Sequence, residues 1–153
     1  TVLNDFDVLV ADWEPSFHDA HINSFVGKKI PAYCTGAGKV ILSYLPPNEV
    51  EALLQNHVLK KCTKNTITNK KKFIEELTIT SSRGFGVSIE EFGPDVIAVA
   101  APIFNINNVV IASIAVAALK SRIIDESQIN KLGKSVIKSA SSISKELGSS
   151  FYK

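Results

Sequence analysis

The sequence predicts an α+β fold in which an antiparallel sheet is flanked by helices and a long helix closes the chain. Three patterns predict it. A strand-like alternation lies near the N-terminus, three closely spaced apolar segments lie in the second half, and apolar residues at helical spacing follow them. Because strands come first, helices lie in the middle and a hairpin-rich block follows, antiparallel pairing is favoured over a doubly wound parallel sheet.

The first expected strand spans residues 6–13, where apolar side chains alternate between two sides. One side consists of Phe6, Val8 and Val10. Residues 18–26 are a weaker candidate for the pairing partner, because their alternation is less regular. The turn between the two segments would be Glu14–Pro15–Ser16.

Three helices are expected in the middle of the chain. Thr35 can cap the first, which stops at Pro46–Pro47. Its apolar residues are Val40, Ile41, Leu42 and Leu45. A second, shorter helix turns Val50, Leu53 and Leu54 inward. Threonines and asparagines precede a third, amphipathic helix, which ends at Arg83–Gly84. Its apolar anchors are Phe73, Ile74 and Leu77.

Three strands and a long helix complete the fold. The strands span approximately residues 85–92, 95–103 and 109–119, and the polar residues 105–108 predict a hairpin between the last two. The final helix begins near Asp125, and Gly148 is well placed as the residue that follows its end. Its apolar positions are Ile129, Leu132, Val136, Ile137, Ala140, Ile143 and Leu147.

The last two strands are apolar on both sides, so both faces of the sheet need cover. One face is made of small side chains, namely Ala98, Ala100, Ser113, Ala115 and Ala117. Because protein interiors pack densely, something must fill the space above them. A closely packed helix and a bound ligand are the two candidates, and composition alone favours the helix.

Composition indicates a single ordinary domain, residues 1–153, without a repeat or a linker. The chain is 45% hydrophobic with a net charge of +2, which disfavours disorder and gives no electrostatic case for a nucleic-acid or membrane surface. It has no apolar stretch that could span a bilayer and no signal-peptide pattern, so we expect a cytoplasmic protein. The sequence lacks methionine, so either an initiator was trimmed or the chain is a piece of a longer protein.

The glycine-rich stretch "PAYCTGAGKVIL" does not match a nucleotide-binding loop. A Walker A loop needs glycine where Tyr33 stands and Ser or Thr where Val40 stands, and a dinucleotide fingerprint needs glycine at Ile41. We therefore expect no nucleotide cofactor. The first amides of the helix, those of Gly36, Ala37 and Gly38, have no partner within it and could hold a carboxylate. A capped helix that packs its glycines against the sheet is at least an equal alternative.

The remaining reactive residues predict neither a metal site nor a catalytic site. His18 and His21 would point to opposite faces of a strand, so they cannot converge on one ion. Glu90 and Glu91 are adjacent rather than facing, unlike the carboxylate pair of a glycoside hydrolase. The two cysteines, Cys34 and Cys62, are expected to be free thiols, and Cys34 to be a small apolar filler.

Several blocks resemble the effector-binding domain of IclR-type transcriptional regulators. They are "KIPAYCTGAGKVILSYLP", "TKNTITNKKKFIEEL", "RGFGVSIEEFGPDVIAVAAPIF", "VVIASIAV" and the helix running to "KELG", in the order of the family. The resemblance implies a GAF-like domain with a small-molecule pocket on one face of its sheet. It also implies homodimers or homotetramers, and DNA binding only through an N-terminal winged helix-turn-helix, which does not precede Thr1 in this chain.

The family binds small organic acids or aromatic compounds at the turn that corresponds to Gly36 and Ala37 and on the sheet. The ligand-binding residues expected here are Gly36, Ala37, Gly38, Ser88, Val96, Ala98, Ser113, Ala115 and Ala117. Several depart from the family pattern: Ser88 replaces an Asp, Ala98 replaces a frequent Cys, Ala115 and Ala117 replace serines, and Asp95 replaces a glycine. These changes remove hydrogen-bonding groups. They predict an effector larger or more apolar than glyoxylate or pyruvate.

Two other functions remain open on the sequence. One is a ligand-free structural domain that only assembles dimers or tetramers, with its pocket filled by its own side chains. The other, less favoured, is a GAF-like thiol enzyme that uses Cys34, which would require a neighbouring base. The leading hypothesis is a non-enzymatic sensor whose ligand alters the arrangement of subunits.

Overall fold

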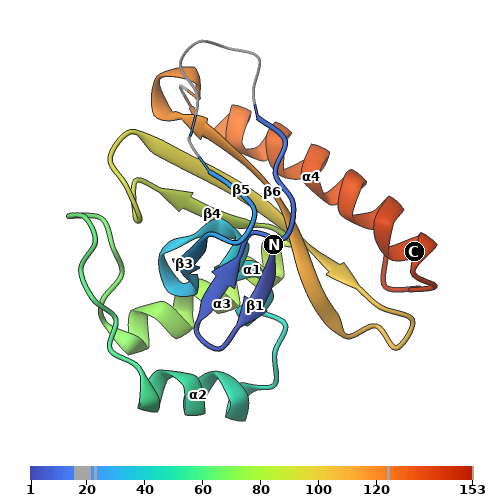
Figure 1. Cartoon of the computed structure of the whole chain (residues 1–153), viewed down its shortest axis with the longest axis horizontal. Coiled ribbons are helices and arrows are strands. Elements are labelled where there is room, and N and C mark those ends of the chain that lie inside the picture. The colour runs from blue at the N-terminus through green and yellow to red at the C-terminus, as the bar shows by residue number, and fades with distance from the viewer. Residues whose placement is uncertain (16–21, 23, 124, 153) are drawn as a thin grey trace.

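The computed structural model describes residues 1–15, 22, 24–123 and 125–152. Its elements are β1 (Val2–Asn4), β2 (Asp7–Leu9), β3 (Lys29–Pro31), the 3₁₀ turn η1 (Ala32–Cys34), α1 (Gly36–Leu42), α2 (Pro47–Asn56), α3 (Lys70–Arg83), β4 (Gly86–Ile89), β5 (Val96–Phe104), β6 (Val110–Leu119), the 3₁₀ turn η2 (Lys120–Arg122) and α4 (Glu126–Glu146). Figure 1 shows α4 lying along the sheet of β4, β5 and β6, with α2 at the far end of the molecule. The strands of this sheet are longer than β1, β2 and β3, and we call it the larger sheet.

The strands form two antiparallel sheets of three strands each, ordered β1-β2-β3 and β4-β5-β6. Hydrogen bonds between Thr1 and Ser113 join the two sheets. The backbone N–H of Ser113 donates to the carbonyl of Thr1 at 2.9 Å, and the N-terminal amine of Thr1 donates to the carbonyl of Ser113 at 2.8 Å. The predicted α+β fold with antiparallel pairing is confirmed.

The first strand has the predicted inward side but a different partner. Phe6, Val8 and Val10 are all buried, whereas the strand itself covers only Asp7–Leu9. It pairs with β1 and with β3, which we did not expect. Most of the segment considered as its partner, residues 16–21 and 23, lies outside the described residues.

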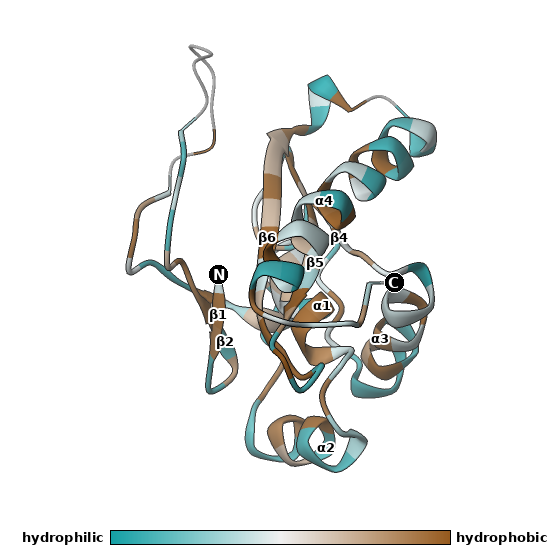
Figure 2. Cartoon of the chain, turned by 90° about the vertical axis from the view of Figure 1, so that its right-hand side faces the viewer, coloured by the Kyte–Doolittle hydropathy of each residue, from teal (hydrophilic) through white to brown (hydrophobic). Residues whose placement is uncertain are grey.

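Helices cover the two faces of the larger sheet differently. The hydroxyl of Ser113 on β6 donates to the carbonyl of Ala37 in α1, so this face of the sheet meets α1. On the other face, Val136 and Ala140 of α4 pack with Val99 and Ala101 of β5. Figure 2 shows the hydrophobic residues concentrated in the central strands and in α1, where these layers meet. The core therefore has two parts separated by the sheet.

Most helix ends agree with the predictions, whereas three apolar side chains expected to face inward are exposed. Thr35, Asn69 and Asp125 cap their helices, and Gly84 and Gly148 follow α3 and α4 with positive φ. The expected anchors that turn out to be exposed are Ile74 (43%), Ile143 (36%) and Leu147 (45%). Each helix buries a narrower stripe of residues than we assumed. On α3 the buried apolar side chains are those of Phe73 and Leu77, and on α4 the buried residues include the small Gly133 and Ala140.

Two expected boundaries were too long. The strand predicted over residues 85–92 ends at Ile89, because Glu90 takes a positive φ of 54° and turns the chain. The first helix ends at Leu42, so Leu45 lies outside it. The hairpin at residues 105–108 is confirmed by the hydrogen bond from the N–H of Asn105 to the carbonyl of Val109, 3.0 Å long.

Candidate functional site

The start of α1 packs directly on the larger sheet. A Cβ added to Gly36 would lie 2.8 Å from the carbonyl oxygen of Ala98 on β5, and one added to Gly38 would lie 2.6 Å from the carbonyl carbon of Ala32. Thr35 caps the helix by accepting the N–H of Gly38 at 3.0 Å. Of the three amides expected to face a ligand, that of Gly38 therefore already has a partner.

The structure brings eight of the nine sequence-predicted site residues, all except Gly38, to one face of the larger sheet. Ser88 lies opposite Ala98, which lies opposite Ala117, and the same register sets Ala100 opposite Ala115. Because side chains alternate along a strand, Val96 shares the face of Ala98. Gly36 and Ala37 come to this face from α1, whereas Gly38 packs against Ala32 of η1.

This small-residue face is only partly covered. Ala100 and Ser113 are fully buried beneath α1, where Ala100 packs with Ala37 and Val40. Ala115 is exposed, and Val96, Ala98 and Ala117 are partly exposed. The helix that composition favoured as the filler thus occupies one half of the face. We call the other half, formed by Val96, Ala98, Ala115 and Ala117, the open patch.

The two serines of the predicted site bind η1 and α1 to the sheet. The hydroxyl of Ser88 is buried and donates to the carbonyl of Cys34 at 2.8 Å. The hydroxyl of Ser113 donates to the carbonyl of Ala37 at 3.2 Å and lies 2.8 Å from that of Thr1. Both groups are satisfied within the protein, so the open patch itself is nearly free of side-chain hydrogen-bonding groups.

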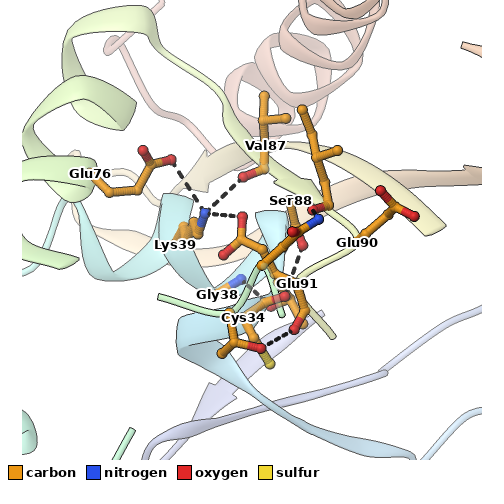
Figure 3. Close-up of polar contacts among 12 residues, drawn as sticks. Cys34, Gly38, Lys39, Glu76, Val87, Ser88, Glu90 and Glu91 are labelled. Atoms are coloured by element: carbon orange, nitrogen blue, oxygen red, sulfur yellow. Dashed lines mark hydrogen bonds and ion pairs between the residues drawn. The ribbon is translucent and has the colours of Figure 1, made fainter. Parts of the chain in front are cut away.

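A buried ion cluster beneath the start of α1 was missed by the sequence reasoning. The ammonium of Lys39 is 1% exposed and contacts Glu91 at 2.6 Å, Glu76 at 3.3 Å and the carbonyl of Val87 at 3.1 Å (Figure 3). These contacts join α1, α3, β4 and the loop that follows β4. A lysine inside an otherwise apolar helix was the one signal that could have indicated it.

Glu91 and its neighbour Glu90 have separate roles. Glu90 pairs with Lys120 on the surface, so the two carboxylates do not face each other, as predicted. Glu91 is buried, and its Oε2 atom has no hydrogen-bond partner among the described residues. Burial raises the pKa of the Glu91 carboxyl, and the ammonium of Lys39 only partly opposes this shift.

The raised pKa of Glu91 predicts a pH dependence of stability. A carboxyl whose folded pKa exceeds its unfolded pKa stabilises the fold fully below the unfolded value, and this contribution is lost as the pH rises through the folded value. We expect the free energy of unfolding of the wild type, measured against that of Glu91→Gln, to fall as the pH rises above the ordinary pKa of a glutamate, about 4.3. Urea unfolding at a series of pH values measures it. A free energy of unfolding of the wild type that rises with pH relative to that of Glu91→Gln would contradict the raised pKa.

The geometry of Cys34 does not suit a nucleophile. The thiol is buried and donates to the carbonyl of Pro31 at 3.3 Å, and burial raises the pKa of Cys34 far above its usual range. A nucleophilic cysteine needs the opposite shift. No group of three or more His, Cys, Asp or Glu residues that could hold a metal occurs in the described part of the chain, and His18 and His21 lie outside it.

Two hollows lie away from the open patch. One of about 380 Å³ lies between the start of α4 and the opposite side of β4 and β5, where Val87, Ile97 and Ile129 form part of its wall. The other, of about 230 Å³, lies beside β2 and the end of α2, near Phe6 and His57. Neither is lined by residues of the predicted site.

Comparison with known proteins decides the family. Residues 2–145 match the family described as the bacterial transcriptional regulator IclR C-terminal domain. The chain belongs to this family. The HTH-type transcriptional regulator KipR of Bacillus subtilis is 32% identical to this IclR C-terminal domain over 123 residues, which are 80% of the chain and 49% of KipR. The chain thus spans about half the length of KipR.

Solved structures agree with the fold of this IclR C-terminal domain. The crystal structure of Thermotoga maritima IclR matches with a TM-score of 0.90 and 29% identity, over 96% of this chain and 59% of that one. The inducer-binding domain of the Acinetobacter transcription factor PobR, a double mutant in complex with 3-hydroxybenzoic acid, matches with a TM-score of 0.83 and 26% identity, over 94% and 84% of the two chains.

These matches confirm the resemblance seen in the sequence. The relatives carry the names of transcriptional regulators, and the chain is a domain of that family rather than an enzyme. Within the described residues, no helix combines the length and the hydrophobicity needed to cross a membrane.

Proposed function

We propose that this IclR C-terminal domain binds a small organic effector on the open patch, beside the start of α1. The observation that carries the proposal is the half-covered small-residue face: α1 seals Ala100 and Ser113, while Ala98, Ala115 and Ala117 remain accessible next to it. The amides of Gly36 and Ala37 begin α1 at the edge of this patch, where a carboxylate would meet the positive end of the helix.

The effector is a bulky, mainly apolar acid or aromatic compound. The hydroxyls of Ser88 and Ser113 are already bonded to the carbonyls of Cys34 and Ala37, so they do not serve a polar ligand. Each buried polar group of a ligand that is left without a partner costs about 1–3 kcal/mol. A ring lying on alanines avoids this cost. The PobR domain in complex with 3-hydroxybenzoic acid is a relative that binds such a compound.

Effector binding acts through the arrangement of subunits. The domain forms a homodimer or homotetramer, and DNA is bound by a helix-turn-helix domain outside these residues. By thermodynamic linkage, the effector changes DNA binding only if it binds one arrangement of subunits more tightly than another.

Calorimetric titration with a matched pair of variants tests the site. Ala115 and Val116 are adjacent exposed residues of β6, and their side chains lie on opposite faces of the sheet. The titrants are glyoxylate, pyruvate, benzoate and 3-hydroxybenzoate. We expect a benzoate to bind, Ala115→Trp to weaken it at least about tenfold by filling the patch, and Val116→Trp to change it less than about twofold, a tenfold change being 1.4 kcal/mol. Tight binding of the two- and three-carbon acids alone, or equal effects of both tryptophans, would overturn the proposal.

A ligand-free assembly domain is the second candidate, because α1 packs on the sheet without a gap and both site serines are satisfied internally. Thermal denaturation separates the two functions. A ligand at a hundred times its dissociation constant adds about 2.7 kcal/mol to the stability of a protein that binds it only when folded. Melting temperatures unchanged across a broader panel of acids and aromatic compounds would favour the assembly domain.

A further inference from the structure

The hollow between the start of α4 and the larger sheet has the volume of a small-molecule site. It measures about 380 Å³, within the range of about 300–1,000 Å³ that is usual for ligand pockets. Its inner wall is apolar, because Val87 of β4 and Ile97 of β5 are buried and Ile129 of α4 faces them. These strand residues alternate with Ala98, so the sheet itself separates the hollow from the open patch.

The first turn of α4 brings a carboxylate to the hollow. Asp125, Glu126 and Ile129 all line it, because residues three or four apart share one face of a helix. The carboxylate of Asp125 is occupied as the helix cap, since it accepts the N–H of Gln128 at 2.9 Å and the hydroxyl of Ser127 at 2.7 Å. Glu126 is exposed, and its carboxylate accepts no hydrogen bond from another described residue. It can therefore receive a cationic group.

Arg83, at the end of α3, brings a fixed cation to the same hollow. Its Nε–H donates to the carbonyl of Phe85 at 2.9 Å, and its guanidinium carbon lies 4.7 Å from the centroid of the Phe85 ring. A guanidinium has five N–H donors, and among the described residues only the Nε–H makes a hydrogen bond. The carboxylate of Glu76 is 4.0 Å from Nη2, and the other cation of the hollow, Lys120, is paired with Glu90.

We propose that this hollow binds an apolar α-amino acid. Its carboxylate accepts hydrogen bonds from the guanidinium of Arg83, its ammonium donates to the carboxylate of Glu126, and its hydrocarbon side chain packs on Val87 and Ile97. A simple carboxylic acid would leave Glu126 beside another negative group, and a simple amine would leave Arg83 beside another positive one. A zwitterion satisfies both. The proposal does not depend on an effector at the open patch.

Amide chemical-shift mapping of the ¹⁵N-labelled chain with three titrants of similar shape tests the ligand class. They are L-leucine, 4-methylpentanoate, which lacks the ammonium, and 3-methylbutylamine, which lacks the carboxylate. We expect saturable shifts centred on Ile97 and Ile129 with leucine, and affinities at least about tenfold weaker for both analogues, because each loses one charge-assisted contact. Leucine without saturable shifts at these residues, or an analogue that binds as tightly as leucine, would overturn the proposal.

Matched variants test the site. Glu126→Gln should weaken leucine binding at least about fivefold, whereas Glu146→Gln, at the exposed far end of α4, should change it less than about twofold. Both positions are on the surface, so both variants should fold. Ala115→Trp fills the open patch and should leave leucine binding unchanged, which separates this site from the proposed effector site. Equal effects of the two glutamine variants, or loss of leucine binding in Ala115→Trp, would contradict the assignment.

Discussion

Replacing Lys39 with methionine is expected to destabilise the domain by about 3–5 kcal/mol, because it leaves the buried carboxylate of Glu91 without its cation. The ammonium of Lys39 is the group that contacts both Glu91 and Glu76 beneath α1. Methionine fills a similar volume, so the loss reports charge rather than packing. The measurement is the free energy of unfolding in urea at neutral pH.

Two further variants show whether the loss arises from the ion cluster. Lys71→Met removes a lysine that is exposed on α3 and should change stability by less than about 0.5 kcal/mol. Adding Glu91→Gln to Lys39→Met removes the buried negative charge and should restore part of the loss. If Lys39→Met lies within about 1 kcal/mol of the wild type, the cluster is not the internal support of α1 that the contacts indicate.

Gly38→Ala is expected to destabilise the domain by about 3 kcal/mol or more, since the added methyl group would overlap backbone rather than a movable side chain. Its Cβ would lie 2.6 Å from the carbonyl carbon of Ala32, and the carbonyl oxygen and Cα of the same residue would lie closer still. Either η1 or α1 must move, and α1 is held to the sheet on its other side by the close approach of Gly36 to Ala98. Urea unfolding again measures the loss.

Gly93→Ala is the matched control for this substitution. A Cβ at Gly93 would meet as its nearest neighbour the side chain of Val96 at 3.9 Å, an ordinary van der Waals contact. We expect a change of less than about 1 kcal/mol there. Equal stabilities of Gly38→Ala and Gly93→Ala would show that α1 does not lie as close to η1 as the structure has it.

Features set by local chemistry were predictable from the sequence. The caps at Thr35 and Asp125 and the ends at Gly84 and Gly148 depend on a few consecutive residues, and all four were expected correctly. The hairpin at residues 105–108 is of the same kind. Alternation along the last two strands also predicted which small residues share a face, because side-chain direction in a strand has a period of two.

Features set by contacts between distant segments were not predictable. The strands β1 and β3 have three residues each and exist through pairing with β2, so no local pattern announces them. Lys39 is buried because α1, α3 and the segment after β4 meet at one point.

The candidate site was predictable in composition but not in shape. The sequence indicated a small-residue face and the start of α1, and the structure brings these residues to one side of the sheet. It did not indicate that α1 would cover only half of that face. Nor did the sequence indicate that the hydroxyls of Ser88 and Ser113 would donate to the carbonyls of Cys34 and Ala37, which depends on the distance to the backbone rather than on residue type.

The most direct test of the sensor function is amide chemical-shift mapping of the ¹⁵N-labelled chain titrated with 3-hydroxybenzoate. The proposed site predicts saturable shifts centred on Gly36, Ala37, Ala98 and Ala117, with little change along α4. Saturable shifts centred instead on Ile97 and Ile129, which line the hollow beside α4, would move the ligand to the opposite face of the sheet and contradict the account.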